Sequence, residues 1–242
     1  PVDGLAAWQE GLLSVQNEAA MLVGHAADPQ PGWSVADLCA APGGKTAHLA
    51  ERTGDKVRIL AVDVHPDRLK LVEEQAGRLG IRGIRCLNAD SATGLDPSGQ
   101  PAFAAWREQA DLVLADVPCS GLGLLGRKPE IRLNMTYERL GSFYPLQAAI
   151  LDTAAGLVRP GGVLVYSTCT INPAENDGQI DAFLQRQGGR FLADSMTDLL
   201  PAALTGQPDL AVQADRGRLQ LLPHRHGTDG FYIARLRKVN QP

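Results

Sequence analysis

The sequence predicts an α/β fold built on a doubly wound, mostly parallel sheet, and two observations lead to this prediction. Short apolar runs typical of buried strands alternate along the chain with longer stretches in which apolar residues recur at helical spacing. Acidic residues, cysteines and glycines follow these runs directly, where the strands of a parallel sheet end at a ligand crevice. The 242 residues and a hydrophobic fraction of 44% suit one large domain with an ample core.

The first half of the chain carries three strand predictions. Residues 1–30 have a loosely helical pattern, and two prolines and a glycine within residues 28–32 then break the chain. The best-marked helix begins at Pro66, keeps its apolar residues on one face and stops at Gly80. The expected strands span residues 33–38, 57–62 and 84–87, and the expected helices span residues 46–52 and 66–79.

The second half continues the alternation with longer connections. Residues 94–110 predict a connection with a short amphipathic piece, and residues 121–140 predict an irregular loop because they hold three glycines and a proline. Residues 190–215 have no clear pattern, whereas the two apolar runs after them predict a closing hairpin. The expected strands span residues 111–115, 162–166, 218–222 and 230–236, and the expected helices span residues 143–158 and 174–187.

Composition narrows the class of protein. No apolar run approaches the roughly 18 residues of a membrane span, and no secretory signal is present. The four cysteines form no C-x-x-C pair, so we expect no metal site and a reducing, cytoplasmic environment. A net charge of -4 argues against a surface that binds nucleic acid everywhere but allows a basic rim around a site. The chain begins without Met, so we expect a fragment that lacks a preceding domain.

A cofactor site is predicted where the first strand ends. Gly43 and Gly44 form a tight turn before a helix start, which lets a ligand approach unpaired backbone N–H groups. Asp63 ends the second strand, where a carboxylate can bind ribose hydroxyls, and Asp90 ends the third, where an acid can read an adenine amino group. The turn is not G-x-G-x-x-G, and the first glycine of a P-loop would fall at Cys39, so a nicotinamide-dependent dehydrogenase and a P-loop nucleotidase are both remote.

Two thiols follow the fourth and fifth strands. Cys119 lies in Asp116-Val117-Pro118-Cys119-Ser120-Gly121, and Cys169 lies in Ser167-Thr168-Cys169-Thr170. Two thiols, one carboxyl and the cofactor turn could therefore share one crevice, which is the equipment for attacking a ring carbon covalently while a cofactor donates a group. A buried cysteine outside such a motif is usually a small hydrophobe, which is our interpretation of Cys86.

Three motifs in order carry a resemblance to a known family. Asp37-Leu38-Cys39-Ala40-Ala41-Pro42-Gly43-Gly44-Lys45-Thr46 precedes the two cysteine motifs, and Asn172-Pro173-Ala174-Glu175-Asn176 follows them. Together they closely resemble the S-adenosylmethionine-dependent RNA cytosine-5 methyltransferases of the Sun/NOL1/NOP2 family, in the bacterial 16S rRNA methyltransferase-like branch. The resemblance implies a Rossmann-like class I methyltransferase with a seven-stranded sheet, helices on both faces and a C-terminal antiparallel hairpin. It also implies a helical lead-in (residues 1–30), a methyltransferase domain (residues 31–238) and an N-terminal RNA-binding domain that is absent from this chain.

The resemblance further implies transfer of a methyl group from S-adenosylmethionine to C5 of a cytosine in RNA, through a covalent bond between a cysteine and C6. Chemistry alone leaves the thiol roles open, because DNA cytosine methyltransferases carry their nucleophile in a Pro-Cys motif like that of Cys119. The resemblance assigns Cys169 as the nucleophile and Cys119 to proton removal or product release. Asp116 would bind the cytosine N3/N4 edge, and Lys45 would stabilise charge in the pocket. The expected cofactor-binding residues are Cys39, Ala40, Ala41, Pro42, Gly43, Gly44, Lys45, Asp63, Asp90 and Asp116.

The expected partner is RNA, with ribosomal RNA expected ahead of transfer RNA, and the expected oligomeric state is a monomer. Arg127, Lys128 and Arg132 follow the Cys119 loop and are expected to contact phosphate, while the target base must be unstacked to reach the strand ends. The sequence does not separate a ribosomal RNA enzyme from a transfer RNA cytosine-5 methyltransferase. A non-catalytic RNA-binding assembly factor is the alternative of a different class, and the intact thiols speak against it.

Overall fold

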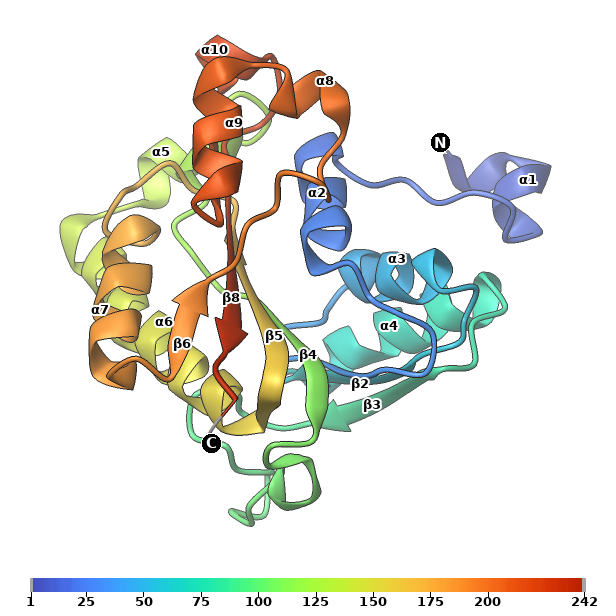
Figure 1. Cartoon of the computed structure of the whole chain (residues 1–242). Helices are drawn as coiled ribbons and strands as arrows, with labels where there is room; N and C mark the ends of the chain where they lie inside the picture. Colours follow the sequence, from blue (N-terminus) through green and yellow to red (C-terminus); the bar gives the residue numbers. More distant parts are fainter. Residues whose placement is uncertain (1, 241–242) are drawn as a thin grey trace.

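The computed structural model describes residues 2–240, and its centre is one eight-stranded sheet (Figure 1). The strands are β1 (Ser34–Asp37), β2 (Arg58–Asp63), β3 (Ile84–Asn88), β4 (Ala110–Asp116), β5 (Val158–Thr168), β6 (Phe191–Ala193), β7 (Arg218–Leu221) and β8 (Phe231–Lys238). Their order is β3-β2-β1-β4-β5-β8-β6, with β7 also paired to β8. The pairs from β3 to β5 are parallel, and β8 is antiparallel to its three neighbours.

The predicted fold class is confirmed, with one difference in strand number. The sheet is mostly parallel and ends in the β7–β8 hairpin, as expected. Eight strands occupy the seven positions of the predicted sheet, because β7 and β6 pair with successive parts of the same β8 edge. The short β6 lies in the region that has no clear sequence pattern.

The helices lie on both faces of the sheet (Figure 1). The longer ones are α2 (Glu18–Ala27), α3 (Gly44–Arg52), α4 (Pro66–Arg78), α6 (Tyr137–Leu157), α7 (Asp177–Gln187) and α9 (Pro208–Asp215). The short ones are α1 (Ala6–Gln9), α5 (Ile131–Asn134), α8 (Ala202–Thr205) and α10 (Pro223–His226), with 3-10 turns η1 (Val2–Gly4), η2 (Ala104–Trp106) and η3 (Leu122–Leu124).

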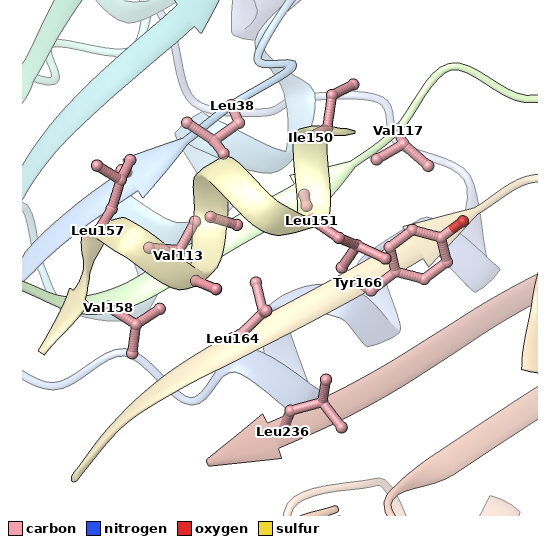
Figure 2. Packing of buried hydrophobic residues seen from close by; sticks show 14 of the residues in the cluster. Leu38, Val113, Val117, Ile150, Leu151, Leu157, Val158, Leu164, Tyr166 and Leu236 are labelled. Carbon is pink, nitrogen blue, oxygen red and sulfur yellow. The ribbon is translucent and has the colours of Figure 1, made fainter. Parts of the chain in front are cut away.

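Alternate residues of the central strands supply two separate cores. Val113 and Leu164 face α6, where they pack with Ile150 and Leu151 (Figure 2). Their neighbours along the same strands, such as Leu112, face α2 and α3 on the other side of the sheet. Both faces are buried, which explains why these strands are continuous apolar runs rather than alternating ones. We call the side covered by α6 and α7 the α6 face.

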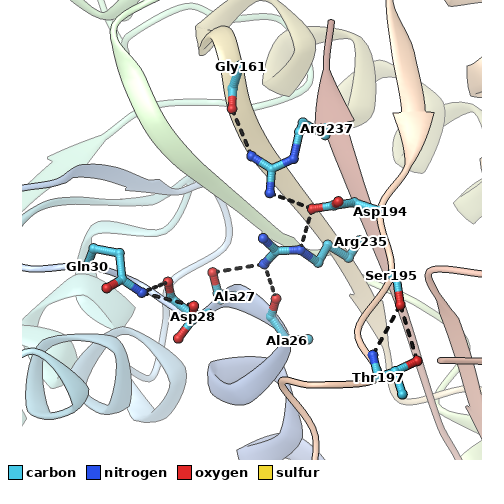
Figure 3. A network of polar contacts seen from close by, with 10 residues as sticks. All are labelled: Ala26, Ala27, Asp28, Gln30, Gly161, Asp194, Ser195, Thr197, Arg235 and Arg237. Carbon is cyan, nitrogen blue, oxygen red and sulfur yellow. Dashed lines mark hydrogen bonds and ion pairs between the residues drawn. The ribbon is translucent and has the colours of Figure 1, made fainter. Parts of the chain in front are cut away.

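The helix α2 is fixed at its C-terminus by the last strand (Figure 3). The guanidinium group of Arg235 donates hydrogen bonds to the carbonyls of Ala26 and Ala27 and pairs with Asp194 at 2.7 Å. Arg237 pairs with the same carboxylate from its exposed side. A buried cation thus satisfies the free carbonyls of the helix end, where the helix dipole favours positive charge.

The N-terminal segment is less helical than predicted. Residues 10–17 form no regular helix, and Leu12 and Val15 are largely exposed, so the helical structure of this segment is confined to η1, α1 and α2. Asn17 caps α2 by accepting a hydrogen bond from the N–H of Ala20. Arg78, at the end of α4, holds the segment by donating to the carbonyls of Trp8 and Leu13.

Three other boundaries differ from the prediction. The strand β5 begins at Val158 and not at residue 162, because residues 159–162 form an irregularity in its pairing with β4 instead of breaking the chain. The loop over residues 121–140 contains η3, α5 and the start of α6, whose first turn is capped by Thr136. The helix expected from residue 174 begins at Asp177, because residues 172–176 form turns around the buried Glu175.

Candidate active site

The carboxyl ends of the parallel strands meet at one crevice, as the strand-end residues predict. A cavity of about 490 Å³ there is lined by Cys39, Asp63, Asp90 and both thiol-bearing loops. A smaller cavity of about 210 Å³ adjoins it, and Lys45 and Gln16 line this second space. Three residues line both cavities: Cys39, Ala41 and Asp116. The turn after β1 and the end of β4 therefore form the boundary between the two spaces.

The turn after β1 is built so that backbone can face the crevice. Gly43 has a φ of +109° and a Cβ there would lie 3.1 Å from the Cα of Val72, so both conformation and space require glycine. The helix α3 begins at Gly44. Below the turn, Thr46 donates a 2.6 Å hydrogen bond to the fully buried Asp37, whose pKa burial raises to about 7.

The other expected cofactor residues lie around the same crevice. Asp63 accepts a hydrogen bond from the N–H of His65, and Arg68 reaches over it to the carbonyl of Ala41. Asp90 accepts from the N–H of Ala92 and lines the opposite part of the cavity. Ala40, Pro42 and Gly44 line the smaller cavity, and Gly43 lines neither one.

The two cysteines are direct neighbours, with 3.4 Å between their sulfur atoms. The hydrogen bond from the Cys119 thiol lowers the pKa of Cys169, and the nearby Lys45 ammonium acts in the same direction against burial and Asp116. The same contact, together with burial, raises the pKa of Cys119 well above its ordinary value. Cys169 is therefore the sulfur that more readily becomes a thiolate, and Cys119 is the thiol that donates to it.

A charged pair borders the thiols. The ammonium of Lys45 lies 2.7 Å from one carboxylate oxygen of Asp116, and Ser167 donates to the other at 2.6 Å. Burial opposes the charge on Lys45, but Asp116 outweighs it and raises the pKa of this lysine. The ammonium also lies 5.3 Å from the centre of the Phe231 ring. The four residues expected to be catalytic are thus brought together.

A buried carboxylate links the two cysteine loops. Glu175 is fully buried and accepts hydrogen bonds from the N–H and hydroxyl of Ser120, from Gln147 and from Asn172. Thr170, next to Cys169, completes the link through a 2.8 Å contact with the Ser120 hydroxyl. The motif around Glu175 is visible in the sequence, but its connection to a residue 55 positions earlier is not.

Close backbone packing adds a second link between the loops. The N–H of Gly123 donates to the carbonyl of Cys169, and its own carbonyl accepts from Gly230. A Cβ at Gly123 would lie 2.0 Å from the Gly230 oxygen, so this contact requires glycine. The loops that carry Cys119, Cys169 and Phe231 therefore have little freedom to move relative to one another.

The expected basic rim is only partly free to bind anions. Arg127 pairs with Asp229 at 3.1 Å, although two-thirds of its side chain is exposed. Arg132 lines a shallow groove of about 310 Å³ together with Tyr137, which is 90% exposed.

None of the helices within residues 2–240 combines the length and the apolar composition that a membrane crossing requires. No group of three or more His, Cys, Asp or Glu side chains in this part of the chain could hold a metal ion.

Known proteins resemble this chain over nearly its whole length. The model of a family described as 16S rRNA methyltransferase RsmB/F matches residues 25–237. A Synechocystis protein described as a probable ribosomal RNA small subunit methyltransferase B is 41% identical, across 97% of this chain and 50% of its own. The mouse tRNA (cytosine(72)-C(5))-methyltransferase NSUN6 is also 41% identical, across 69% of this chain and 35% of its own.

A solved structure shares the fold. NSun6 from Pyrococcus horikoshii with SFG superimposes with a TM-score of 0.81 at 29% identity, covering 100% of this chain and 57% of its own. The chain spans about half the length of the curated ribosomal RNA methyltransferases that it matches.

Proposed function

The chain belongs to the RsmB/F family of 16S rRNA methyltransferases, and on that premise we propose that it methylates C5 of a cytosine in ribosomal RNA with S-adenosylmethionine. Membership confirms the predicted relationship to the Sun/NOL1/NOP2 enzymes. The observation that carries the proposal is the pair of thiols, 3.4 Å apart, beside the Lys45–Asp116 ion pair at the edge of the crevice. In the proposal, residues 31–238 form the methyl-transfer domain.

The larger crevice has the chemistry that S-adenosylmethionine requires. Asp63 and Asp90 place carboxylates where ribose hydroxyls and an adenine amino group can donate to them. Leu146 and Ile150 supply an apolar wall, and the cofactor turn supplies backbone. When bound, the cofactor supplies an electrophilic methyl group on a sulfonium. The similar structure of Pyrococcus horikoshii NSun6 with SFG, an analogue of this cofactor, supports the assignment.

Covalent attack prepares the cytosine ring for the methyl group. C5 of cytosine is too weak a nucleophile, so the Cys169 thiolate forms a bond to C6 and the electron pair of the C5–C6 double bond moves toward C5. Lys45 and Asp116 border this sulfur, where they bind the N3/N4 edge and balance the charge that develops on the ring. The cofactor, held by Asp63, Asp90 and the turn after β1, would then supply its methyl group to C5 and leave as the neutral thioether.

Release of the product requires loss of the C5 proton. A solvent water accepts this proton, the electron pair of the C5–H bond re-forms the C5–C6 double bond, and the C6–sulfur bond breaks as Cys169 leaves as a thiolate. Cys119 is placed to assist, because its sulfur lies against that of Cys169. Its raised pKa keeps it protonated at neutral pH, so it hydrogen-bonds the leaving thiolate instead of competing as a second nucleophile.

A transcript of 16S rRNA tests the proposal directly. The wild-type chain is incubated with the transcript and methyl-labelled S-adenosylmethionine, and the RNA is digested to nucleosides for mass spectrometry. Label in 5-methylcytidine is expected, and label in another nucleoside would contradict the proposed chemistry. Cys169→Ala serves as the control that keeps the fold and the cofactor crevice but lacks the nucleophile.

A transfer RNA substrate is the second candidate, because the mouse relative at 41% identity is described as a tRNA cytosine-5 methyltransferase. The same incubation with total transfer RNA separates the two. Label in transfer RNA alone would move the assignment to that substrate and leave the reaction unchanged. The absence of label in both RNAs, with cofactor binding intact, would favour the non-catalytic assembly factor.

A further inference from the structure

A separate cavity lies at the amino ends of the strands, opposite the crevice of the thiols. It has a volume of about 560 Å³, which exceeds that of the crevice. Its walls come from the starts of β1, β2 and β3 and from the turn around η2. The residues that line it are Ser34, Arg58, Ile59, Arg82, Gly83, Ile84, Arg85, Ala105, Trp106 and Gln109.

The side chains of β1, β2 and β3 that form the floor of this cavity are polar, whereas the side chains of a covered sheet face are normally apolar. Leu60 of β2 and Leu87 of β3 lie on the α6 face of the sheet. Because side chains alternate along a strand, the residues two positions earlier, Arg58 and Arg85, lie on the same face. Ser34 is the strand partner of Arg58 on this side and accepts its hydrogen bond at 2.7 Å. Doubly wound sheets are normally covered on both faces, so polar floor residues here indicate a space filled by something other than protein.

The reason for the space lies in the connection between β3 and β4. Its regular structure consists of the three-residue turn η2 and isolated bridges, whereas the β1–β2 and β2–β3 connections each contain a full helix. The half-buried Trp106 of η2 therefore stands at the side of the cavity without a helix to cover it.

The charged residues that line the cavity are all arginines. Arg58, Arg82 and Arg85 are exposed, and none of them forms an ion pair with the described residues. No residue that lines the cavity is acidic. Three free guanidinium groups in a protein of net charge -4 mark a local site for anions.

The loop that carries Arg82 is fixed in place. Both carboxylate oxygens of Asp55 accept hydrogen bonds, one from the N–H of Arg82 and one from that of Gly83. A Cβ at Gly83 would lie 2.2 Å from the carbonyl oxygen of Val57, so the loop must pack directly on the start of β2. Little further ordering of the backbone is needed before an anion binds.

We propose that this cavity is a second RNA-binding site, at which the three arginines bind phosphates of the substrate RNA far from the target cytosine. The inference rests on the proposed function. Guanidinium groups bind phosphate oxygens in pairs, and the indole of Trp106 offers a surface for a base or sugar. At about 3.3 Å per residue, the six residues of β2 separate the two sites by roughly 20 Å, so one RNA can occupy both.

Two charge-matched variants test the site by filter binding to a labelled 16S rRNA transcript. Arg82→Gln/Arg85→Gln removes two of the proposed phosphate contacts. The control, Arg186→Gln/Arg216→Gln, removes two exposed arginines near the ends of α7 and α9. We expect the first variant to weaken RNA binding about tenfold at 50 mM salt and to lower the salt slope by about 2, while the control changes affinity less than about twofold. The affinity for S-adenosylmethionine should be the same in all three proteins.

Equal loss of RNA affinity in both variants would overturn the inference, because it would reflect net charge alone. A second measurement locates the contact: a transcript containing 4-thiouridine, after irradiation, should crosslink to the peptide that contains Trp106. A different result would overturn the RNA assignment. If AMP or inorganic phosphate binds the wild-type cavity at millimolar concentration, while Arg82→Gln/Arg85→Gln binds the transcript as tightly as the wild type does, the cavity is a site for small anions and not for RNA.

Methyl incorporation is measured in parallel so that the two proposals can fail separately. If the wild type binds the transcript through these arginines but transfers no methyl group, the proposed function fails and the second site remains. If methyl transfer proceeds and Arg82→Gln/Arg85→Gln has wild-type affinity, only the second site is wrong.

Discussion

The sulfur of Cys119 lies 3.4 Å from that of Cys169, and this one contact shifts the pKa values of the two thiols in opposite directions. Donation from Cys119 lowers the pKa of Cys169, while the pKa of Cys119 itself rises well above its usual value. Neighbouring sulfurs that differ in this way can divide the work of attack and release between them.

Replacement of each thiol should give a different product. Cys169→Ala should abolish methyl transfer, because no thiolate can add to C6. Cys119→Ala should still form the bond to RNA but release it slowly, so a protein–RNA adduct should accumulate on a denaturing gel. An adduct in Cys169→Ala and none in Cys119→Ala would reverse the assigned roles.

The pH dependence of adduct formation should report the same contact. The rate should rise with pH as Cys169 loses its proton, and Cys119→Ala should move this rise to higher pH because the hydrogen bond that lowers the pKa of Cys169 is lost. Cys119→Ser keeps a donor at the same place and should move it less. The measurement is a single-turnover rate at several pH values, and identical profiles in the three proteins would contradict the prediction.

Glu175→Gln should slow methyl transfer without unfolding the protein. One carboxylate oxygen accepts from the N–H of Ser120 and the other from its hydroxyl, whereas an amide keeps a single acceptor oxygen and so loses one of the two hydrogen bonds. A shift of the Cys119 loop by about 1 Å can cost about 10²-fold in rate. The check is kcat together with the affinity for S-adenosylmethionine: kcat should fall, the affinity should stay, and the pH profile should move toward that of Cys119→Ala.

Asp37 should make the protein more stable in mild acid than at alkaline pH. Burial raises its pKa from 3.8 to about 7, so between these values the folded state binds a proton that the unfolded state has lost. Stability from this group is therefore full below about pH 4 and falls as pH rises toward and through 7. Urea unfolding at pH 5.5 and 8 should show the difference, which Asp37→Asn should largely remove. Equal pH dependence in both proteins would contradict the prediction.

The two arginines bound to Asp194 should contribute unequally to stability. Arg235 is 5% exposed and also binds the end of α2, so Arg235→Gln leaves a partly buried carboxylate and two carbonyls short of donors. A loss of about 3 kcal/mol in the free energy of unfolding is expected. Arg237→Gln, which removes the exposed partner of the same carboxylate, should cost about 1 kcal/mol or less. Similar losses in both variants would contradict this account.

The sequence predicted the strand ends well because their signals are local. Asp63, Asp116 and Cys169 each lie at or just after an apolar run, and the parallel topology brings such residues to one edge. The link between Ser120 and Glu175 could not be predicted in the same way, because it joins residues 55 positions apart through a buried network.

Local signals also misled at two places. Residues 159–162 carry a proline and two glycines, which predict a break, yet they join β5 because the sheet tolerates an irregular register there. The apolar residues at 12–15 fit a loosely helical pattern, but the segment is irregular and Arg78 from α4 donates a hydrogen bond to the carbonyl of Leu13 within it. In both cases a tertiary contact outweighs a local preference.

The position of β8 has a consequence for synthesis of the chain on the ribosome. This last strand lies between β5 and β6, and the pairing partner of both β6 and β7 is β8. Until residues 231–238 emerge, β5 has an open edge and neither shorter strand has a partner in the sheet. Phe231 and the loop after β5 therefore reach their places only after residues 231–238 have been synthesised, so the candidate site cannot be complete before then.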